Sequence, residues 1–423
     1  MSERVIYIVR SWPRLSQTFI LNEVLALQRR GVELVIYSLA RSGEETVQAG
    51  VAEVSAPVRY LEDRPGPPWL SSLRLHLGLL AAAPLQYARV VAYCLARPWL
   101  AAGYGECTTL QCLSLAARIA TDVSTMRSLG TNILHVHAHF AHDPALVGML
   151  TARLSRLPFS FTAHARDLVQ IPAAALAARA SQARTVVTCC EANAAYITSV
   201  VPSRSRPPVL VIHHGVDLSA FVPPPRRATV TVPTVVSVGR LVEKKGYLDL
   251  LRALAMVRDT GAAFNCKIFG DGPLRDQLSE VRDSLGLRDL VDLMGPRDND
   301  RIAAELRAAD LFVLTPLVTS DGDRDGIPNV LVEAMASGLP VVTTSAGGVT
   351  ELVRHDTNGL VAAPGDVRRV ADLVGALLSD PERRARLGAA ARRTVERDFD
   401  IDAAARQLEG LLVPRARKLG VSW

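Results

Sequence analysis

The chain has 423 residues, of which 49% are hydrophobic, and it can therefore bury a large core. Single cores seldom grow beyond about 250 to 300 residues, so this length predicts two domains. The net charge is +6, but no basic helix or aromatic-basic module indicates nucleic acid, and the six cysteines have neither zinc-site nor disulfide-framework spacing.

The positive charge is concentrated in the first half of the chain. Residues 1–220 hold 20 basic and 14 acidic residues, whereas the remaining residues hold 28 of each. This asymmetry favours an anionic partner, either a phosphate-bearing acceptor or an anionic membrane surface. An ordinary solvated, arginine-rich surface is the alternative.

The chain begins with a strand-helix-strand pattern. Residues 5–9 predict a buried strand, residues 19–30 a helix that ends at Gly31, and residues 34–38 a second strand. The intervening loop, 10–18, contains no glycine, which argues against a nicotinamide-binding Rossmann turn. Because no signal peptide core precedes the first strand, we expect a cytoplasmic protein, with the inner face of the membrane as a further location.

Residues 65–130 have a helical pattern with interleaved aromatic and arginine residues. The longest uncharged run, 75–88, is too short to span a bilayer and contains Pro84. These helices either pack against the sheet or lie in a membrane interface.

Short apolar runs then alternate with helical lengths, which predicts open, mostly parallel sheets. Pro223 to Pro225, followed by two arginines, is the best linker, because consecutive prolines cannot continue a helix or a central strand. The predicted strands are residues 133–136, 159–162, 185–188 and 209–212 before the linker, and 234–238, 264–269, 291–293, 311–315 and 340–344 after it.

Four histidines, His135, His137, His139 and His142, lie close together in sequence and raise the possibility of a metal site. We predict no metal here, because no nearby acid or thiol cluster completes the set.

The most informative stretch runs from Asp325 to Pro340. Pro328 suits the first position of a helix and Gly338 the residue just past its end. The unpaired amides of such a helix start carry partial positive charge, which suits a phosphate. Asp325 lies beside this start, and Glu333 can accept hydrogen bonds from a vicinal diol such as a ribose.

This stretch resembles the paired-acid motif of the retaining glycosyltransferases of family 4, with Asp325 in place of the first glutamate. The strings at residues 13–19, 137–140 and 321–328 resemble the exopolysaccharide-building, colanic-acid-type branch of that family. The resemblance covers almost the whole chain. It implies an α/β protein of the GT-B fold, in which two doubly wound Rossmann-like domains face each other across a cleft.

The resemblance also implies a domain plan. Residues 1–222 form the acceptor-binding domain with the helical insert at about 65–130, residues 223–400 form the nucleotide-sugar-binding domain, and a helix in 401–423 crosses back to the first domain. Asp321 and Asp323 superficially match the metal-binding pair of the GT-A fold, but they precede a helix start in a two-domain chain, so we expect no required cation.

Site residues follow from the same resemblance. The catalytic residues are His164, Asp325, Arg240 and Lys245, where the two cations hold the donor diphosphate and His164 touches a donor-sugar hydroxyl. The donor is bound by Glu333, Gly326, Ile327, Pro328, Asn329, Gly270, Gly272, Gly295, Gly347 and Gly348. The acceptor is bound by Arg14, Ser16, Thr18 and His139.

The expected function is transfer of a sugar, with retention, from a UDP- or GDP-sugar to a hydroxyl of a lipid-linked or polysaccharide intermediate. The expected partners are this nucleotide-sugar, that acceptor and an anionic membrane, and no cofactor is expected because the nucleotide-sugar is a substrate. Alternatives are a glycosyltransferase acting on a small secondary metabolite, a nucleotide-sugar epimerase and a non-catalytic sugar-nucleotide-binding homologue.

Overall fold

The computed structural model describes residues 2–14, 17–44, 47–62, 68–103, 107–225 and 232–413. The chain folds as two compact units. Unit 1 comprises Met1–Ile212 together with Asp402–Trp423, and unit 2 comprises His213–Ile401. The division falls before the predicted linker, of which Arg226 and Arg227 lie outside the described residues.

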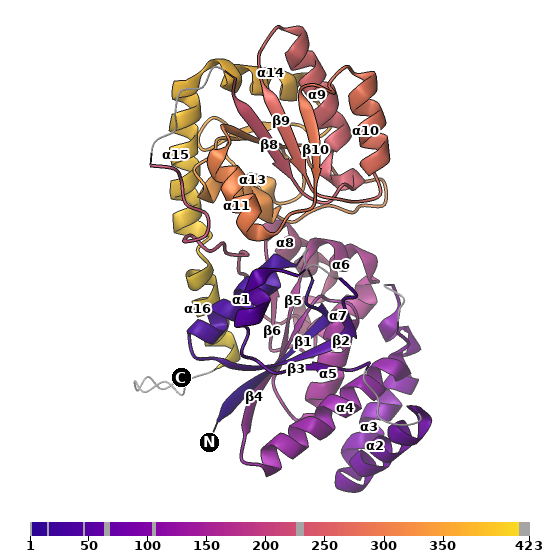
Figure 1. Ribbon diagram of the computed structural model, residues 1–423. Helices are drawn as coiled ribbons and strands as arrows, with labels where there is room; N and C mark the ends of the chain where they lie inside the picture. The colour runs from indigo at the N-terminus through magenta and orange to yellow at the C-terminus, as the bar shows by residue number, and fades with distance from the viewer. Residues whose placement is uncertain are drawn as a thin grey trace. The chain divides into compact units, whose positions relative to one another are not determined.

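Unit 1 is built on a sheet of seven parallel strands in the order β3-β2-β1-β4-β5-β6-β7 (Figure 1). The interior strand β1 is almost completely buried from Val5 to Val9, as its uninterrupted apolar run requires. The strands are β1 (Glu3–Trp12), β2 (Glu33–Arg41), β3 (Val58–Tyr60), β4 (Asn132–His139), β5 (Phe159–Ala163), β6 (Thr185–Thr188) and β7 (Val209–Val211).

Helices cover this sheet, and the last one comes from the end of the chain. The final helix, α16, packs on α1 through ion pairs of Arg29 with Asp402 (3.2 Å) and of Arg30 with Glu409 (2.6 Å). The unit 1 helices are α1 (Thr18–Arg29), α2 (Pro68–Ala82), α3 (Pro84–Leu95), α4 (Thr109–Ser128), α5 (Asp143–Ser155), α6 (Ala165–Gln170), α7 (Ala173–Ala180), α8 (Glu191–Val200) and α16 (Ile401–Leu412), with 3₁₀ turns at Ala49–Glu53, Pro98–Ala101 and Ser203–Ser205.

The first two helices of the insert, α2 and α3, pack on α4 and on each other, whereas α4, the third, packs on strand β4 of the sheet (Figure 1). They leave several apolar side chains at least two-fifths exposed, including Leu77, Leu85 and Leu95. In the described part of the chain, no helix combines the length and the apolar character that a membrane span requires.

Unit 2 has a sheet of six parallel strands in the order β10-β9-β8-β11-β12-β13. The strands are β8 (Thr234–Val238), β9 (Asn265–Phe269), β10 (Val291–Gly295), β11 (Leu311–Leu314), β12 (Val341–Thr344) and β13 (Leu360–Ala362). The helices are α9 (Tyr247–Asp259), α10 (Arg275–Ser284), α11 (Asn299–Ala308), α12 (Asn329–Ala336), α13 (Val349–Leu352), α14 (Val367–Ser379) and α15 (Pro381–Asp398), with a 3₁₀ turn at Glu243–Lys245.

Each predicted strand is present, with ends that differ from the prediction by a few residues at most. The prediction lacks two edge strands, β3 and β13, each of three residues. Both sheets are parallel, so the strand ends that are expected to carry ligand-binding loops lie along one edge of each sheet.

Candidate functional site

The loop after β8 brings two lysines to the acidic segment that precedes α12. Nζ of Lys245 lies 2.6 Å from Oδ2 of Asp325, and Nζ of Lys244 lies 3.3 Å from Oδ1 of the same carboxylate. Lys244 also pairs with Asp323 at 3.0 Å. All four side chains are less than one-fifth exposed, so solvent screens these pairs weakly.

Charge at Asp325 is set by two opposing effects. Burial raises the pKa of the Asp325 carboxyl, but the ammonium groups of Lys245 and Lys244 outweigh it and hold the pKa below its ordinary value. Asp325 is therefore ionised at neutral pH, and the lysines are held close to one another without uncompensated repulsion.

Glu333 has a different environment, although it lies in the helix that follows. Its side chain is 7% exposed on α12. Burial raises the pKa of Glu333 to about 7, and the attraction of Lys245 offsets only part of this rise. A carboxylate with this pKa gains from any ligand that donates hydrogen bonds to its charged form.

Two glycines allow the loops around α12 to come together. Gly347 has φ +61°, and a Cβ placed there would lie 2.0 Å from the backbone oxygen of Asp325. The adjacent Gly348 donates its N–H to the backbone oxygen of Gly326 at 2.7 Å. The loop after β12 thus packs directly on the loop that carries Asp325.

The helix start itself differs from the prediction by one residue. Pro328 has ψ 118° and lies outside the helix, so α12 begins at Asn329. The expected helical position of Pro328 is wrong because its backbone is extended, whereas Gly338 follows the helix end with φ +67°, as predicted. Ile327 and Pro328 are buried beneath this start.

The predicted base-binding glycines lie at neighbouring strand ends. Gly239 donates its N–H to the backbone oxygen of Phe269, and Gly270 donates to that of Gly295 at 3.0 Å. Gly272 lies against Leu241, where a Cβ would meet the backbone oxygen at 2.6 Å. The loops after β8, β9 and β10 are therefore in mutual contact.

Arg240 is exposed on the loop after β8. Among the described residues, its guanidinium makes no hydrogen bond or ion pair. The structure brings together Lys245, Asp325 and Glu333 in unit 2 and leaves Arg240 at the surface of the same strand-end edge.

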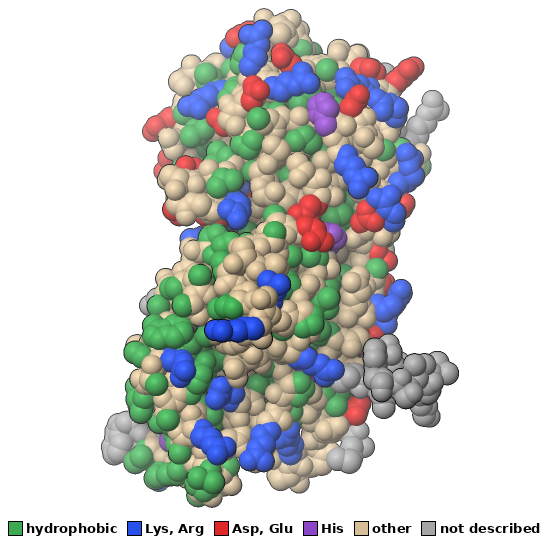
Figure 2. All heavy atoms as spheres, turned by 180° about the vertical axis from the view of Figure 1, so that it is seen from behind, with side chains coloured by type: hydrophobic (Ala, Val, Ile, Leu, Met, Phe, Trp, Pro, Cys, Tyr) green, Lys and Arg blue, Asp and Glu red, His purple; other side chains and the backbone are tan. Residues whose placement is uncertain are grey.

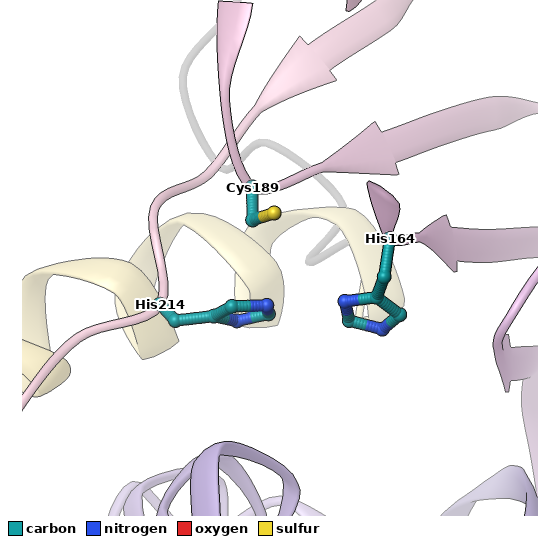
Figure 3. Close-up of side chains that lie close together, drawn as sticks. All are labelled: His164, Cys189 and His214. Atoms are coloured by element: carbon teal, nitrogen blue, oxygen red, sulfur yellow. The ribbon is translucent and has the colours of Figure 1, made fainter. Parts of the chain in front are cut away.

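In unit 1, His164 directly follows β5 and precedes α6. Its backbone N–H donates to Oδ1 of Asp167 at 2.9 Å, and Oδ2 of Asp167 accepts from the N–H of Ala141 at 2.5 Å. Burial raises the pKa of Asp167 to about 7. His164 and Cys189 mark the ends of the paired strands β5 and β6 (Figure 3).

His139 is completely buried at the end of β4. Its Nδ1 lies 3.3 Å from Nε2 of His164, and its Nε2 lies 2.9 Å from Oε1 of Glu23. The expectation that no acid lies near the histidines is wrong, because α1 brings Glu23 to them. A contact of His139 with the acceptor stays a prediction.

The other predicted acceptor residues lie in or beside the loop after β1. Arg14 is exposed and Thr18 is the first residue of α1, whereas Ser16 lies outside the described residues. Of the remaining histidines, His137 is hydrogen-bonded to Ser160 and Thr162 within the sheet.

Comparison with known proteins identifies the unit that holds the paired acids. Residues 223–394 match the family model described as "Glycosyl transferases group 1". Unit 2 is a group 1 glycosyltransferase domain. The chain as a whole has the GT-B fold of two Rossmann-like units.

Two curated relatives of this chain are informative. The putative colanic acid biosynthesis glycosyltransferase WcaL of Escherichia coli is 36% identical over 208 residues, which cover 49% of this chain and 51% of WcaL. The GDP-mannose-dependent alpha-(1-6)-phosphatidylinositol monomannoside mannosyltransferase of Mycobacterium tuberculosis is 35% identical over 207 residues, 47% of this chain and 54% of the relative. The chain thus spans about half the length of these relatives.

Among solved structures, Anabaena Alr3699/HepE in complex with UDP and glucose superposes on this chain with a TM-score of 0.69. The match covers 97% of this chain and 100% of HepE at 18% identity. This similarity extends the shared fold beyond unit 2 to unit 1.

Proposed function

We propose that this protein is a retaining glycosyltransferase, which moves a sugar from a nucleoside diphosphate to an acceptor hydroxyl. The observation that carries the proposal is the largely buried Lys245–Asp325 pair, which lies near Glu333 of α12 in a group 1 glycosyltransferase domain. A fixed cation next to a helix start is suited to a diphosphate, and buried carboxylates are suited to sugar hydroxyls.

Different residues bind the diphosphate, the base and the ribose of the donor. Lys245 and the exposed Arg240 neutralise the diphosphate, and the glycine loops after β9 and β10 admit the base. Glu333 accepts two hydrogen bonds from the ribose diol, which favours its charged form. The donor is a UDP- or GDP-sugar: HepE was crystallised with UDP and glucose, and the mycobacterial relative is named GDP-mannose-dependent.

The chemical step follows from the charges. The bond between the anomeric carbon and the diphosphate oxygen breaks, its electron pair stays on that oxygen, and Lys245 with Arg240 stabilises the new charge. The acceptor hydroxyl forms its bond from the same face and passes its proton to a phosphate oxygen. Asp325, paired with two lysines, is a weak nucleophile, so we infer no covalent intermediate. Because Lys245 and Arg240 supply the positive charge for the diphosphate, we infer no required metal.

The acceptor is a lipid-linked or polysaccharide intermediate at the inner face of the membrane. Residues 68–103 contain three arginines and no acid, and their helices expose the apolar side chains of Leu77, Leu80, Leu85 and Leu95. Figure 2 shows hydrophobic side chains interspersed with Lys and Arg over the lower part of unit 1. Such a surface fits an anionic bilayer interface, and it supports a peripheral contact.

Donor identity and stereochemistry are tested together. The purified protein is heated with a panel of UDP- and GDP-sugars, because a ligand that binds the folded state raises its Tm. The stabilising sugar is then supplied with membrane-extracted acceptor, and the anomeric configuration of the product is read by NMR. An inverted product, or a glycosyl adduct on Asp325 in the trapped enzyme, would overturn the mechanism.

The membrane contact is tested by flotation with vesicles of pure phosphatidylcholine and with vesicles that contain phosphatidylglycerol. We expect binding to the anionic vesicles only, and its loss in the double variant Leu77→Asp, Leu85→Asp. Leu210→Asp, at an exposed leucine on β7 of the same unit, is the matched control. Equal binding by the double variant and the control would contradict the proposed surface.

A further inference from the structure

A chain of four side chains crosses the centre of unit 1. Tyr7 comes from β1, Glu23 from α1 and His139 from the end of β4, while His164 follows β5. The strands β1, β4 and β5 are neighbours in the sheet, which is why residues far apart in sequence meet here. Tyr7 and His139 are fully buried, and the side chain of Glu23 is 14% exposed.

The distances define an order of contacts. Oε1 of Glu23 lies 2.9 Å from Nε2 of His139, and Nδ1 of His139 lies 3.3 Å from Nε2 of His164. The hydroxyl of Tyr7 donates to Oε1 of Glu23 and lies 2.5 Å from Nε2 of His139. The carboxylate is therefore at one end of the chain and His164 at the other.

The hydrogen-bond partners indicate which atoms of Tyr7, His139 and His164 carry protons. A carboxylate only accepts, so Tyr7 donates its O–H and His139 donates its Nε2–H to Glu23. Burial, together with the charge of Glu23 and the hydrogen bond to it, raises the pKa of Tyr7 well above its ordinary value, so the O–H is retained. With Nε2–H of His139 donated to Glu23, Nδ1 of His139 lies 3.3 Å from Nε2 of His164 and can accept the Nε2–H of that ring.

We propose that Glu23 is a positioning residue that acts through His139 to fix the orientation of His164 and its Nε2–H tautomer. This inference rests on the proposed function, in which His164 serves the donor sugar. In this tautomer the ring is neutral, and the lone pair on Nδ1 of His164 can accept the backbone N–H of Asp167, with which His164 forms a capping box at the start of α6. A neutral ring does not repel the positive charge that develops at the anomeric carbon, whereas an imidazolium would.

Glu23, His137 and His139 also have ligand atoms within 4.8 Å of one another, which is the spacing of a metal site. The hydrogen bonds favour the relay instead. Nδ1 of His137 lies 2.7 Å from Oγ of Ser160 and its Nε2 lies 3.0 Å from Oγ1 of Thr162, so both ring nitrogens are engaged within the sheet.

The test is Glu23→Gln, which keeps the shape of the side chain but replaces the carboxylate by an amide that can also donate. We expect kcat to fall roughly 10- to 100-fold, as is usual for residues that orient a functional ligand, with the KM for the donor changed less than about threefold. Glu23→Asp retains a carboxylate and is expected to recover part of the loss. Glu33→Gln is the control, because Glu33 is exposed and pairs with Arg4 at the start of β1.

The tautomer of His164 is measured by NMR and needs no activity assay. Long-range ¹H–¹⁵N spectra of protein labelled with ¹⁵N-histidine report which ring nitrogen is protonated. His164→Asn identifies the signals of His164. We expect a protonated Nε2 and an unprotonated Nδ1 in the wild type and in Tyr7→Phe, and a mixture of tautomers in Glu23→Gln. The same tautomer in Glu23→Gln as in the wild type would overturn the inference, as would wild-type kcat in that variant.

These outcomes are separable from those that test the proposed function. A wild-type protein that transfers no sugar contradicts the function, and the spectra still decide whether Glu23 sets the tautomer. If Glu23→Gln does not fold, the comparison of wild type with Glu23→Asp decides: an unchanged tautomer with reduced kcat supports the relay, and a changed tautomer despite the retained carboxylate contradicts it.

Discussion

Nζ of Lys245 lies 2.6 Å from Oδ2 of Asp325, although 80 positions separate the two residues in the chain. This pair joins the loop after β8 to the loop before α12. Its geometry gives Lys245 a fixed position and gives Asp325 a charge at neutral pH, and both properties lead to the first prediction.

Asp325→Asn removes the charge that offsets Lys244 and Lys245. We expect kcat/KM for sugar transfer to fall roughly 100-fold, equivalent to about 2.7 kcal/mol, because a buried charge loses its partner and the lysines repel each other. Asp323→Asn removes only one contact of Lys244 and is expected to cost less. Steady-state kinetics of the two variants, measured side by side, would contradict the prediction if Asp323→Asn were the more damaged.

Glu333 makes stability depend on pH near neutrality. Its pKa is raised to about 7 from 4.5, so between these values the folded state holds a proton that the unfolded state has lost. Stability therefore falls as pH rises through this window, by at most about 1.4 kcal/mol per pH unit, and levels off above pH 7. Urea unfolding between pH 5 and 8 is expected to show this slope in the wild type and a shallower slope in Glu333→Gln.

Asp325 makes stability change with pH in the opposite direction to Glu333, because the pKa of Asp325 in the folded state is lowered. Its contribution to stability is present above the ordinary pKa of 3.8 and is lost as pH falls through the lower folded-state value. We expect Asp325→Asn to reduce the fall in wild-type stability below about pH 4 and to leave the slope between pH 5 and 7 unchanged. Parallel melting curves for both proteins over pH 2 to 7 test this expectation.

Gly347→Ala would place a side chain at a residue with positive φ and bring its Cβ into collision with a neighbouring loop. Its Cβ would lie 2.0 Å from the backbone oxygen of Asp325, so the loop must move and carry Asp325 with it. Gly365→Ala is the matched control: it has φ +79° but nothing within 4 Å of its Cβ. We expect both variants to lose about 1 to 2 kcal/mol from backbone strain, and only Gly347→Ala to weaken nucleotide binding in calorimetric titration.

Arg240 offers a test of binding that leaves the fold unchanged. Because its guanidinium is exposed, Arg240→Ala is expected to shift Tm by less than about 2 °C. The KM for the donor should rise about tenfold, since a diphosphate loses one of its two cations. Arg368→Ala, at an exposed arginine on α14, controls for the loss of surface charge and should leave KM unchanged. A KM for Arg240→Ala equal to that of this control would rule out the diphosphate contact.

The fold could be predicted from the sequence because both sheets consist of buried parallel strands. In the sequence, each such strand is a short apolar run between segments that are long enough to form helices. Val5 to Val9 and Thr234 to Val238 are such runs, and both form strands. The neighbours of each strand could not be predicted, since a strand pattern records burial and not the partner. The pairing of β1 with β4, across the whole helical insert, is decided only in three dimensions.

The sequence by itself determined which residue types are present at the strand ends: Asp325 and Glu333 around a helix start, Lys245 after β8, and His164 after β5. Only the tertiary structure decided their charges and partners. Two lysines lower the pKa of Asp325, and burial raises the pKa of Glu333. Helix α1 places Glu23 in contact with His139, although 116 positions separate them in sequence. The physical reason is that hydrogen bonds and electrostatic interactions depend on distance in space and on exclusion of water. The local sequence pattern determines neither of these two quantities.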